Sequence, residues 1–141
     1  SGLNPLSYPF MNLREVNYIA TEFVDEDTKF LNEYFSIMKK FGLDGKALTL
    51  NLLEIKNLPK SDICFLFKTL DSLETIKKDI TKEILNKINS KIIVVSFPTA
   101  TLSGRKINKK RLIWFERLIK DYSIFEIKNE IFYIIDKTNL Y

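Results

Sequence analysis

The 141-residue sequence contains no histidine. Histidine is the usual general base beside serine and cysteine nucleophiles and a frequent zinc ligand, so its absence argues against these mechanisms and most zinc sites. We therefore expect no bound metal. The single cysteine, Cys64, lies in the apolar run Ile63–Phe67 and has no partner for an internal disulfide. A buried thiol of this kind fits a reducing cytoplasm. An enzyme with this sequence works without a histidine base.

Long apolar runs and linkers are also missing. No apolar run reaches the roughly 18 residues that cross a bilayer, and the first residues lack the basic-then-apolar pattern of a secretory signal. No repeat or linker rich in Gly, Pro or Ser divides the chain, which is 45% apolar and 13% aromatic. This composition is sufficient for one hydrophobic core. We therefore expect a soluble cytoplasmic protein with one domain, residues 1–141, and no membrane partner.

The formal net charge of +4 is modest, but its distribution is uneven. Residues 105–111 contain five cations, and no acidic residue follows before Glu116. Such a cluster indicates either a surface that faces nucleic-acid phosphates or the solvated start of a helix. Its members are Arg105, Lys106, Lys109, Lys110 and Arg111.

Apolar residues alternate along the chain between the spacing of strands and that of helices. Gly42 is expected to end the first helix, and Asp44-Gly45 to form the turn after it. The expected strands are Asn17–Phe23, Lys46–Leu50, Asp62–Phe67 (buried on both faces), Lys91–Phe97 (central and parallel), and a hairpin of Ser123–Ile127 with Ile131–Ile135 turning at Asn129-Glu130. The expected helices are Asp25–Phe41, Asp71 or Ser72 to Ile88, and about Lys109 to Lys120.

Strands that alternate with helices predict an α/β fold with a mostly parallel sheet covered on both faces. The C-terminal antiparallel hairpin predicts one antiparallel edge strand. This pattern is typical of the second half of a Rossmann-like domain. Periodicity alone equally allows a flavodoxin-like or another nucleotide-binding fold, so the fold class does not determine the function.

Four segments, in order and with agreeing spacing, resemble the aminoglycoside-resistance family of 16S ribosomal RNA (guanine-N7) methyltransferases. The chain is similar to that family in Ser1–Leu6 with Pro9–Asn12, Phe65–Leu70 with Leu73-Glu74, Val94–Thr99 with Leu102–Arg105, and Trp114-Phe115-Glu116. The pair formed by Ser96-Phe97-Pro98 and Trp114-Phe115-Glu116 is the most specific element. The resemblance implies a Rossmann-like class I fold that binds S-adenosyl-L-methionine (SAM) and acts on ribosomal RNA in the small subunit.

The resemblance also implies where SAM binds. The first segment corresponds to the glycine loop of the cofactor site, with Gly2, Asn4 and Pro5; a glycine there lets the backbone approach a ligand. Glu22 ends a strand, at the position where SAM-binding Rossmann folds place a carboxylate that accepts from both ribose hydroxyls, with Asp25, Glu26 and Asp27 as nearby alternatives that otherwise stabilise a helix N-terminus. By family order Asn51 and Leu52 face the adenine, although an Asn here can equally form a turn.

The substrate side of the site is expected at Lys68, Ser96, Phe97 and Pro98. Lys68 follows a continuous apolar strand at its carboxyl end, where open α/β sheets bind ligands, which favours a role on either the cofactor or the substrate side; the alternative is a lysine that packs its stem and exposes its ammonium. Phe97 or Pro98 is expected to line the pocket against an unstacked base. Trp114 and Phe115 are expected in the core.

The implied reaction suits a protein without histidine, because guanine N7 carries a lone pair and no proton. The resemblance further implies that the chain begins inside the cofactor loop, so that the first strand and an N-terminal helical extension are missing. We then expect an upstream segment or a second chain to complete the sheet. Two alternatives remain: a non-catalytic SAM- or RNA-binding remnant, and a methyltransferase that acts on tRNA or a small molecule.

Overall fold

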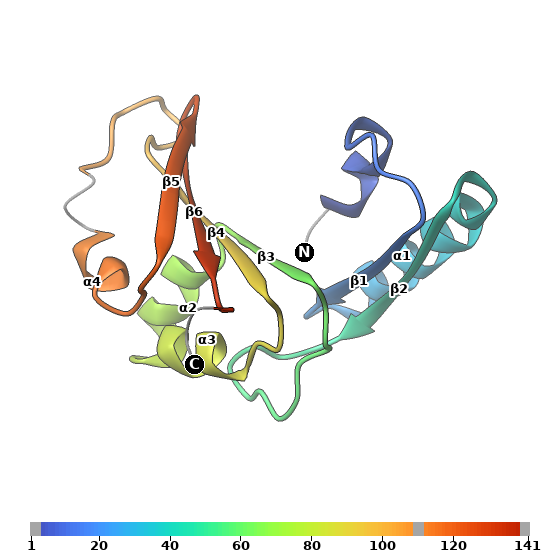
Figure 1. Ribbon diagram of the computed structural model, residues 1–141, viewed down its shortest axis with the longest axis horizontal. Coiled ribbons are helices and arrows are strands. Elements are labelled where there is room, and N and C mark those ends of the chain that lie inside the picture. The colour runs from blue at the N-terminus through green and yellow to red at the C-terminus, as the bar shows by residue number, and fades with distance from the viewer. Residues whose placement is uncertain (1–3, 109–111, 139–141) are drawn as a thin grey trace. The chain divides into compact units, whose positions relative to one another are not determined.

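The computed structural model describes residues 4–108 and 112–138. The chain forms two compact units, Ser1–Ile55 and Lys56–Tyr141, called here the N-terminal and the C-terminal unit (Figure 1). Among the described residues, no helix is both long enough and apolar enough to cross a membrane. No group of His, Cys, Asp or Glu side chains in the same ranges is arranged to bind a metal ion.

The N-terminal unit packs one helix against a two-stranded parallel sheet. The helix α1 begins directly after the first strand. The acidic side chains of its first turn stabilise it, because negative charge interacts favourably with the positive end of the helix dipole. Gly42 ends the helical segment in the left-handed conformation, as expected, with φ of 87°. The elements are η1 (Asn4–Phe10), β1 (Val16–Glu22), α1 (Asp25–Met38), η2 (Lys39–Phe41) and β2 (Leu43–Thr49).

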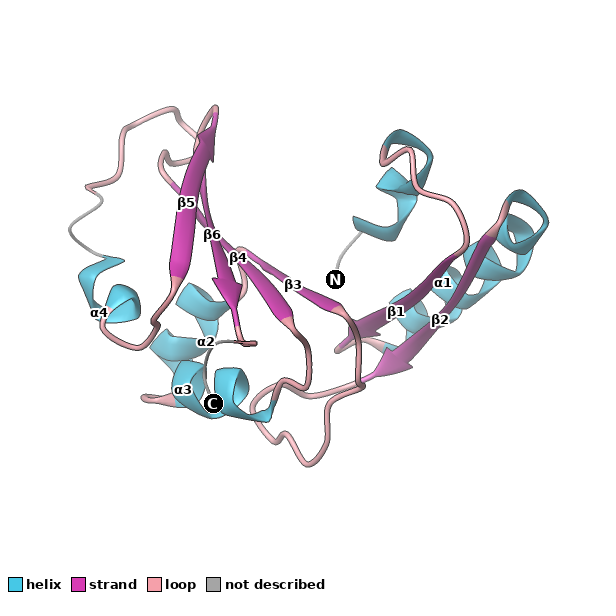
Figure 2. Cartoon of the chain, viewed as in Figure 1, coloured by secondary structure: helices cyan, strands magenta, loops and turns pink. Residues whose placement is uncertain are grey.

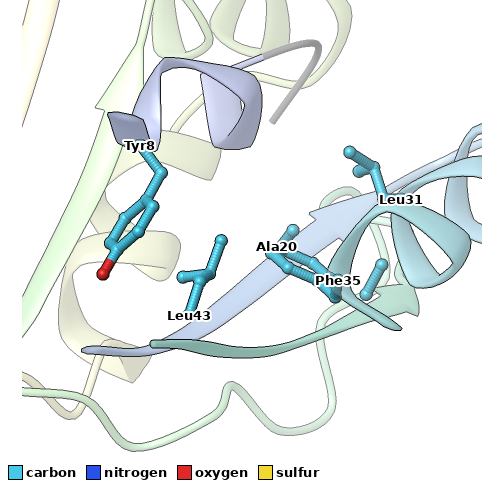
Figure 3. Close-up of a cluster of buried hydrophobic side chains, with 6 residues drawn as sticks. Tyr8, Ala20, Leu31, Phe35 and Leu43 are labelled. Carbon is cyan, nitrogen blue, oxygen red and sulfur yellow. The ribbon is translucent and has the colours of Figure 1, made fainter. Parts of the chain in front are cut away.

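Six buried side chains form the core of this unit (Figure 3). They are Tyr8, Ala20, Leu31, Phe35, Leu43 and Ala47. The turn expected at Asp44-Gly45 is wrong, because β2 already begins at Leu43 and runs through both residues. A Cβ atom on Gly45 would lie 2.3 Å from the Phe35 ring, so glycine serves here to admit an aromatic side chain and not to turn the chain.

The C-terminal unit contains a four-stranded sheet in the order β3-β4-β6-β5 (Figure 2). Strand β4 pairs in parallel with β3 on one side and antiparallel with β6 on the other, which confirms its central place within this unit. Strand β6 also pairs antiparallel with β5. The elements are β3 (Ile63–Phe67), α2 (Leu70–Ile76), α3 (Ile80–Lys87), β4 (Ile92–Pro98), α4 (Ile113–Glu116), β5 (Tyr122–Ile127) and β6 (Glu130–Asp136).

Aromatic side chains dominate the core of the C-terminal unit. The Phe97 ring contacts Phe115 and Tyr133 edge-to-face, with centroids 4.9 and 6.0 Å apart, and all three side chains are fully buried. Trp114 is half-buried, 6.2 Å from Phe97. The Tyr133 hydroxyl donates to Glu116 Oε1 at 2.7 Å, so the Trp-Phe-Glu tripeptide fixes α4 to β6. Burial and this hydrogen bond raise the pKa of Tyr133.

The single helix expected from Asp71 or Ser72 to Ile88 is wrong, because the chain forms two helices separated by residues 77–79. Asp79 adopts a left-handed conformation with φ of 63°. The Glu74 carboxylate accepts hydrogen bonds from the backbone N–H groups of Asp79 (2.6 Å) and Thr81 (3.0 Å). These N–H groups lie at the start of α3 and lack helical partners, so Glu74 supplies the cap that begins a second helix.

Strand β3 is not buried on both faces, contrary to the expectation. It pairs with one neighbour within its sheet, and the Ile63 and Phe65 side chains are exposed. The Cys64 thiol is half-buried. Burial raises its pKa to about 11, against a smaller opposing effect of Lys137. The thiol is therefore protonated at neutral pH.

Three further features differ from the sequence expectation. The hairpin turns at Lys128-Asn129, with Lys128 at φ of 52°, and Glu130 already belongs to β6. The antiparallel strand is the interior strand β6, while β5 forms the edge. In the described part, the helix expected from about Lys109 to Lys120 is reduced to α4, which ends at Glu116 and is followed by a turn at Arg117-Leu118; residues 109–111 lie outside the described part.

Candidate active site

The carboxyl end of β3 leads directly into Lys68. This residue adopts a left-handed conformation with φ of 51°, which a non-glycine residue seldom occupies. Its N–H donates to the Ser96 carbonyl of β4 at 3.0 Å, and the Thr69 hydroxyl donates to the Phe67 carbonyl at 2.9 Å. Helix α2 follows at once. The sharp change of direction between strand and helix places Lys68 at the edge where parallel α/β sheets bind ligands.

A polar network joins this lysine to the neighbouring strands. Lys68 Nζ lies 2.8 Å from Glu130 Oε2, and the Ser96 hydroxyl donates to Glu130 Oε1 at 2.5 Å. Ser96 is fully buried, whereas the Lys68 side chain keeps 56% of its surface exposed. One carboxylate at the start of β6 therefore binds a group from each of the two parallel strands.

A shallow cavity of about 320 Å³ adjoins the network. It is lined by Lys68, Ile127, Lys128, Asn129, Glu130 and Phe132. The Phe132 ring contacts Phe67 edge-to-face and stacks on Phe125 at 4.7 Å between centroids. The cavity therefore combines cationic, anionic and amide groups with an aromatic side chain, which are the chemical types that hold a polar aromatic ligand.

Of the other expected substrate-side residues, the structure places Pro98 at the end of β4 and half-buried. Phe97 lies in the aromatic core, where its ring is surrounded by other rings. The Ser96 hydroxyl is held by Glu130. Lys68 and Pro98 are thus the members of the expected set with surface available to a ligand.

The segment after Pro98, residues 99–107 and called here the basic loop, is fixed at both ends. Thr99 N donates to the Asn129 carbonyl at 2.7 Å, and Ile107 N donates to the Thr99 carbonyl at 2.8 Å. Ala100 and Lys106 form an antiparallel bridge. Arg105 and Lys106 are exposed on this loop. Lys109, Lys110 and Arg111 lie outside the described residues.

In the N-terminal unit, the expected cofactor residues follow β1 and β2. Glu22 is the last residue of β1, and its carbonyl accepts from Leu50 N at 2.7 Å. Asn51 Oδ1 accepts from Leu53 N at 3.0 Å, so this side chain does form a turn. Leu52 is half-buried. Of the acidic alternatives, Asp25 accepts a hydrogen bond from Thr49 at 2.6 Å.

Of the residues expected in the glycine loop, Asn4 and Pro5 belong to the short helix η1. Pro5 is buried, and its carbonyl accepts from the Tyr34 hydroxyl at 3.2 Å. The Asn4 carbonyl accepts from the Ser7 hydroxyl at 2.7 Å. The Tyr34 hydrogen bond fixes the segment to α1, and the Ser7 hydrogen bond lies within η1. Gly2 lies outside the described residues.

Comparison with known proteins gives the family. The family model described as ribosomal RNA methyltransferase (FmrO) matches residues 1–118. The chain belongs to this family. It is 33% identical over 143 aligned residues to the 16S rRNA (guanine(1405)-N(7))-methyltransferase of Micromonospora rosea, covering 96% of this chain and 51% of that protein. The chain thus spans about half the length of the curated relatives it matches.

Solved structures of ribosomal RNA methyltransferases have the same fold. The chain superimposes on the 16S rRNA methylase ArmA with a TM-score of 0.69 and 28% identity, covering 96% of this chain and 69% of that one. It superimposes on RmtF in complex with S-adenosyl-L-homocysteine with a TM-score of 0.71 and 24% identity, covering 92% and 58%. Both the expected family and the expected class I methyltransferase fold are confirmed.

Sequence reasoning missed Glu130, which it assigned to the hairpin turn. No local signal marks this residue, because its partners Ser96 and Lys68 lie 34 and 62 positions earlier in the sequence. With the hairpin turn placed one residue earlier, at Lys128-Asn129, Glu130 would have been expected as the first residue of the last strand. Since β6 begins at Glu130 and Glu130 pairs with Pro98, its side chain lies at the end of β4.

Proposed function

We propose that the protein transfers a methyl group from SAM to N7 of a guanine in small-subunit ribosomal RNA. The match of residues 1–118 to the ribosomal RNA methyltransferase family carries this proposal. The polar network and cavity at the carboxyl ends of β3 and β4 support it, because ligands of open α/β sheets bind at that edge.

The residues that would bind SAM fit its chemistry. Glu22, at the carboxyl end of β1, offers two carboxylate oxygens that can accept from both ribose hydroxyls. Asn51 and Leu52 follow β2, where a polar amide and an apolar side chain suit the adenine. Gly2, Asn4 and Pro5 would lie along the methionine end. Bound SAM supplies an electrophilic methyl group on a sulfonium.

On the substrate side, Lys68 and Pro98 would contact the guanine. Ser96 and Phe97 would act through packing, since the hydroxyl of the first and the ring of the second are already enclosed. Guanine N7 needs no general base, which is consistent with a chain without histidine. Orientation of the acceptor then provides most of the catalysis, and effects of this kind reach about 7–11 kcal/mol in favourable cases.

The basic loop would contact RNA phosphates. Arg105 and Lys106 are exposed beside the strand ends that carry the network. Lys109, Lys110 and Arg111 would extend the same surface. Cations in this position neutralise phosphates and hold the RNA in register without reading its sequence.

A strand from an upstream segment or from a second chain would complete the sheet. Within the described residues, β3 hydrogen-bonds to β4 alone and β1 to β2 alone, so each has one free edge. The exposed apolar side chains of Ile63 and Phe65 lie on β3. Unpaired strand edges favour pairing with another strand. Because the proposed substrate is ribosomal RNA, we place the protein in the cytoplasm.

Transfer of labelled methyl groups from SAM tests the function. The protein in its full natural length should label small ribosomal subunits more than naked ribosomal RNA or tRNA, and chemical cleavage at N7-methylguanosine should locate the product. The Glu22→Gln variant should lose SAM affinity, while Glu33→Gln, an exposed site on α1, should not. SAM binding without transfer would indicate a non-catalytic remnant, and preferential labelling of tRNA would indicate a different substrate.

A further inference from the structure

Glu130 connects three strands at the edge of the sheet where the substrate would bind. Its carboxylate is 2.8 Å from the Lys68 ammonium after β3, and it accepts from the Ser96 hydroxyl of β4 at 2.5 Å. The residue itself begins β6 and pairs with Pro98 across the antiparallel ladder. Its side chain keeps 20% of its surface exposed. The carboxylate at the start of β6 thus binds one side chain that follows β3 and one from β4.

The hydrogen bond from Ser96 and the ion pair with Lys68 have different roles. Ser96 is fully buried, and its hydroxyl requires an acceptor, which Glu130 Oε1 supplies. The contact with Lys68 is partly open to solvent, and ion pairs of this exposure contribute little to stability. The protein does not need this ion pair to remain folded, because the Lys68 ammonium is accessible to water. The ion pair instead restricts where a long, flexible side chain can place its charge.

Lys68 retains donors for a ligand while it is held. An ammonium group has three N–H donors, and the side chain is 56% exposed beside the cavity that Lys68 and Glu130 line together. The backbone of Lys68 is also fixed, since its N–H donates to the Ser96 carbonyl at 3.0 Å. Backbone and ammonium are therefore both tied to the Ser96–Glu130 pair.

We propose that Glu130 is a positioning residue that orients the Lys68 ammonium toward the methyl acceptor, a role that rests on the methyltransferase function proposed above. The edge of guanine that carries N7 also carries O6, and both atoms are acceptors that lysine contacts readily. An ammonium held at the side of the cavity can donate to O6 and align N7 with the methyl group. Glu130 acts through Lys68 and does not touch the reacting atoms.

Isosteric substitution separates this role from a structural one. Glu130→Gln keeps an amide oxygen that can accept from Ser96 but removes the charge that holds Lys68. Because small displacements of a reacting group are costly, we expect kcat for small ribosomal subunits to fall about 100-fold, with KM changed less than about threefold. Glu130→Asp, which keeps the charge, should restore part of the rate. Glu83→Gln is the matched control, since Glu83 pairs with Lys77 and Lys87 on the surface of α3 and should keep full activity.

A double-mutant cycle shows whether Glu130 acts through Lys68. In a Lys68→Met background, Glu130→Gln should cause no further loss of kcat; two independent losses that multiply would overturn the proposal. An unchanged kcat in Glu130→Gln, with an active wild-type protein, would also overturn it. Inactivity of the wild type would overturn the proposed function instead. In that case heteronuclear NMR of the Lys68 ammonium still decides: a slowly exchanging signal that disappears in Glu130→Gln supports the positioning, and a retained signal refutes it.

Discussion

The side-chain amide of Asn32 forms two hydrogen bonds with the backbone of Ala47. Asn32 Oδ1 accepts from Ala47 N at 2.9 Å, and Asn32 Nδ2 donates to Ala47 O at 3.1 Å. A residue of α1 thus occupies the polar groups of β2 that a further strand would otherwise bind. This contact fixes α1 to β2 and occupies the edge of the strand at Ala47.

Asn32→Ala should therefore lower the free energy of unfolding by about 1–2 kcal/mol, because the N–H and the carbonyl of Ala47, which are partly buried, both lose their hydrogen-bond partner. Urea denaturation measures this change. Asn57→Ala, at an exposed position of the C-terminal unit, serves as the control and should change stability by less than about 0.5 kcal/mol. Equal losses in the two variants would contradict the proposed importance of the Ala47 contact.

Gly45→Ala tests the close approach of Phe35 to β2. The new methyl group would lie 2.3 Å from the ring, so we expect a loss of about 1–3 kcal/mol from overpacking. Phe35→Leu in the Gly45→Ala background should recover part of that loss, since a smaller side chain admits the methyl group. Lys46→Ala, on the same strand and exposed, is the control. The prediction fails if the two substitutions add without any recovery.

The cap that Glu74 provides for α3 should make stability depend on pH. Burial alone would raise the pKa of Glu74, but hydrogen bonds from Thr81 and Asp79 lower it below its ordinary value of 4.5. A pKa that is lower in the folded state contributes stability above pH 4.5, and this contribution is lost as the pH falls through the folded value.

Glu74→Gln should thus cost about 1 kcal/mol at pH 7, a typical value for a helix cap, and much less at pH 3. Urea titrations at the two pH values measure the difference. Glu33→Gln, at an exposed position of α1, is the matched control. If the cost of Glu74→Gln were the same at both pH values, the carboxylate charge would not be responsible for the cap.

Charge reversal on the basic loop tests the proposed RNA surface. Arg105→Glu and Lys106→Glu should each weaken binding to small ribosomal subunits. Each lost phosphate contact should reduce the slope of log affinity against log salt by about 0.7–0.9. Lys82→Glu, on the exposed side of α3, changes the net charge by the same amount and is therefore the matched control; it should leave the slope unchanged. Binding that is insensitive to both loop substitutions would remove this loop from the RNA interface.

Features that depend on near neighbours could be predicted from the sequence. The alternation of strands and helices, the stop at Gly42 and the buried run of β4 each follow from local spacing. The break between α2 and α3 could not, because Glu74 and Thr81 lie seven residues apart and a continuous apolar stripe conceals the cap. The residues of the candidate site likewise divide into those marked by their sequence neighbours and those placed by distant residues. Lys68 stands out after an apolar strand, whereas Glu130 acquires its place only when β6 pairs with β4.

The two ends of the basic loop meet at one residue. The Thr99 carbonyl accepts from Ile107 N, and the Thr99 N–H donates to the Asn129 carbonyl. The last residue of the loop is therefore hydrogen-bonded to the first. A loop that closes on itself in this way can change in length or composition at its tip without moving β4 or the β5–β6 turn. Redesign can therefore exchange the segment proposed to face RNA as a module, while the sheet edge proposed as the active site stays the same.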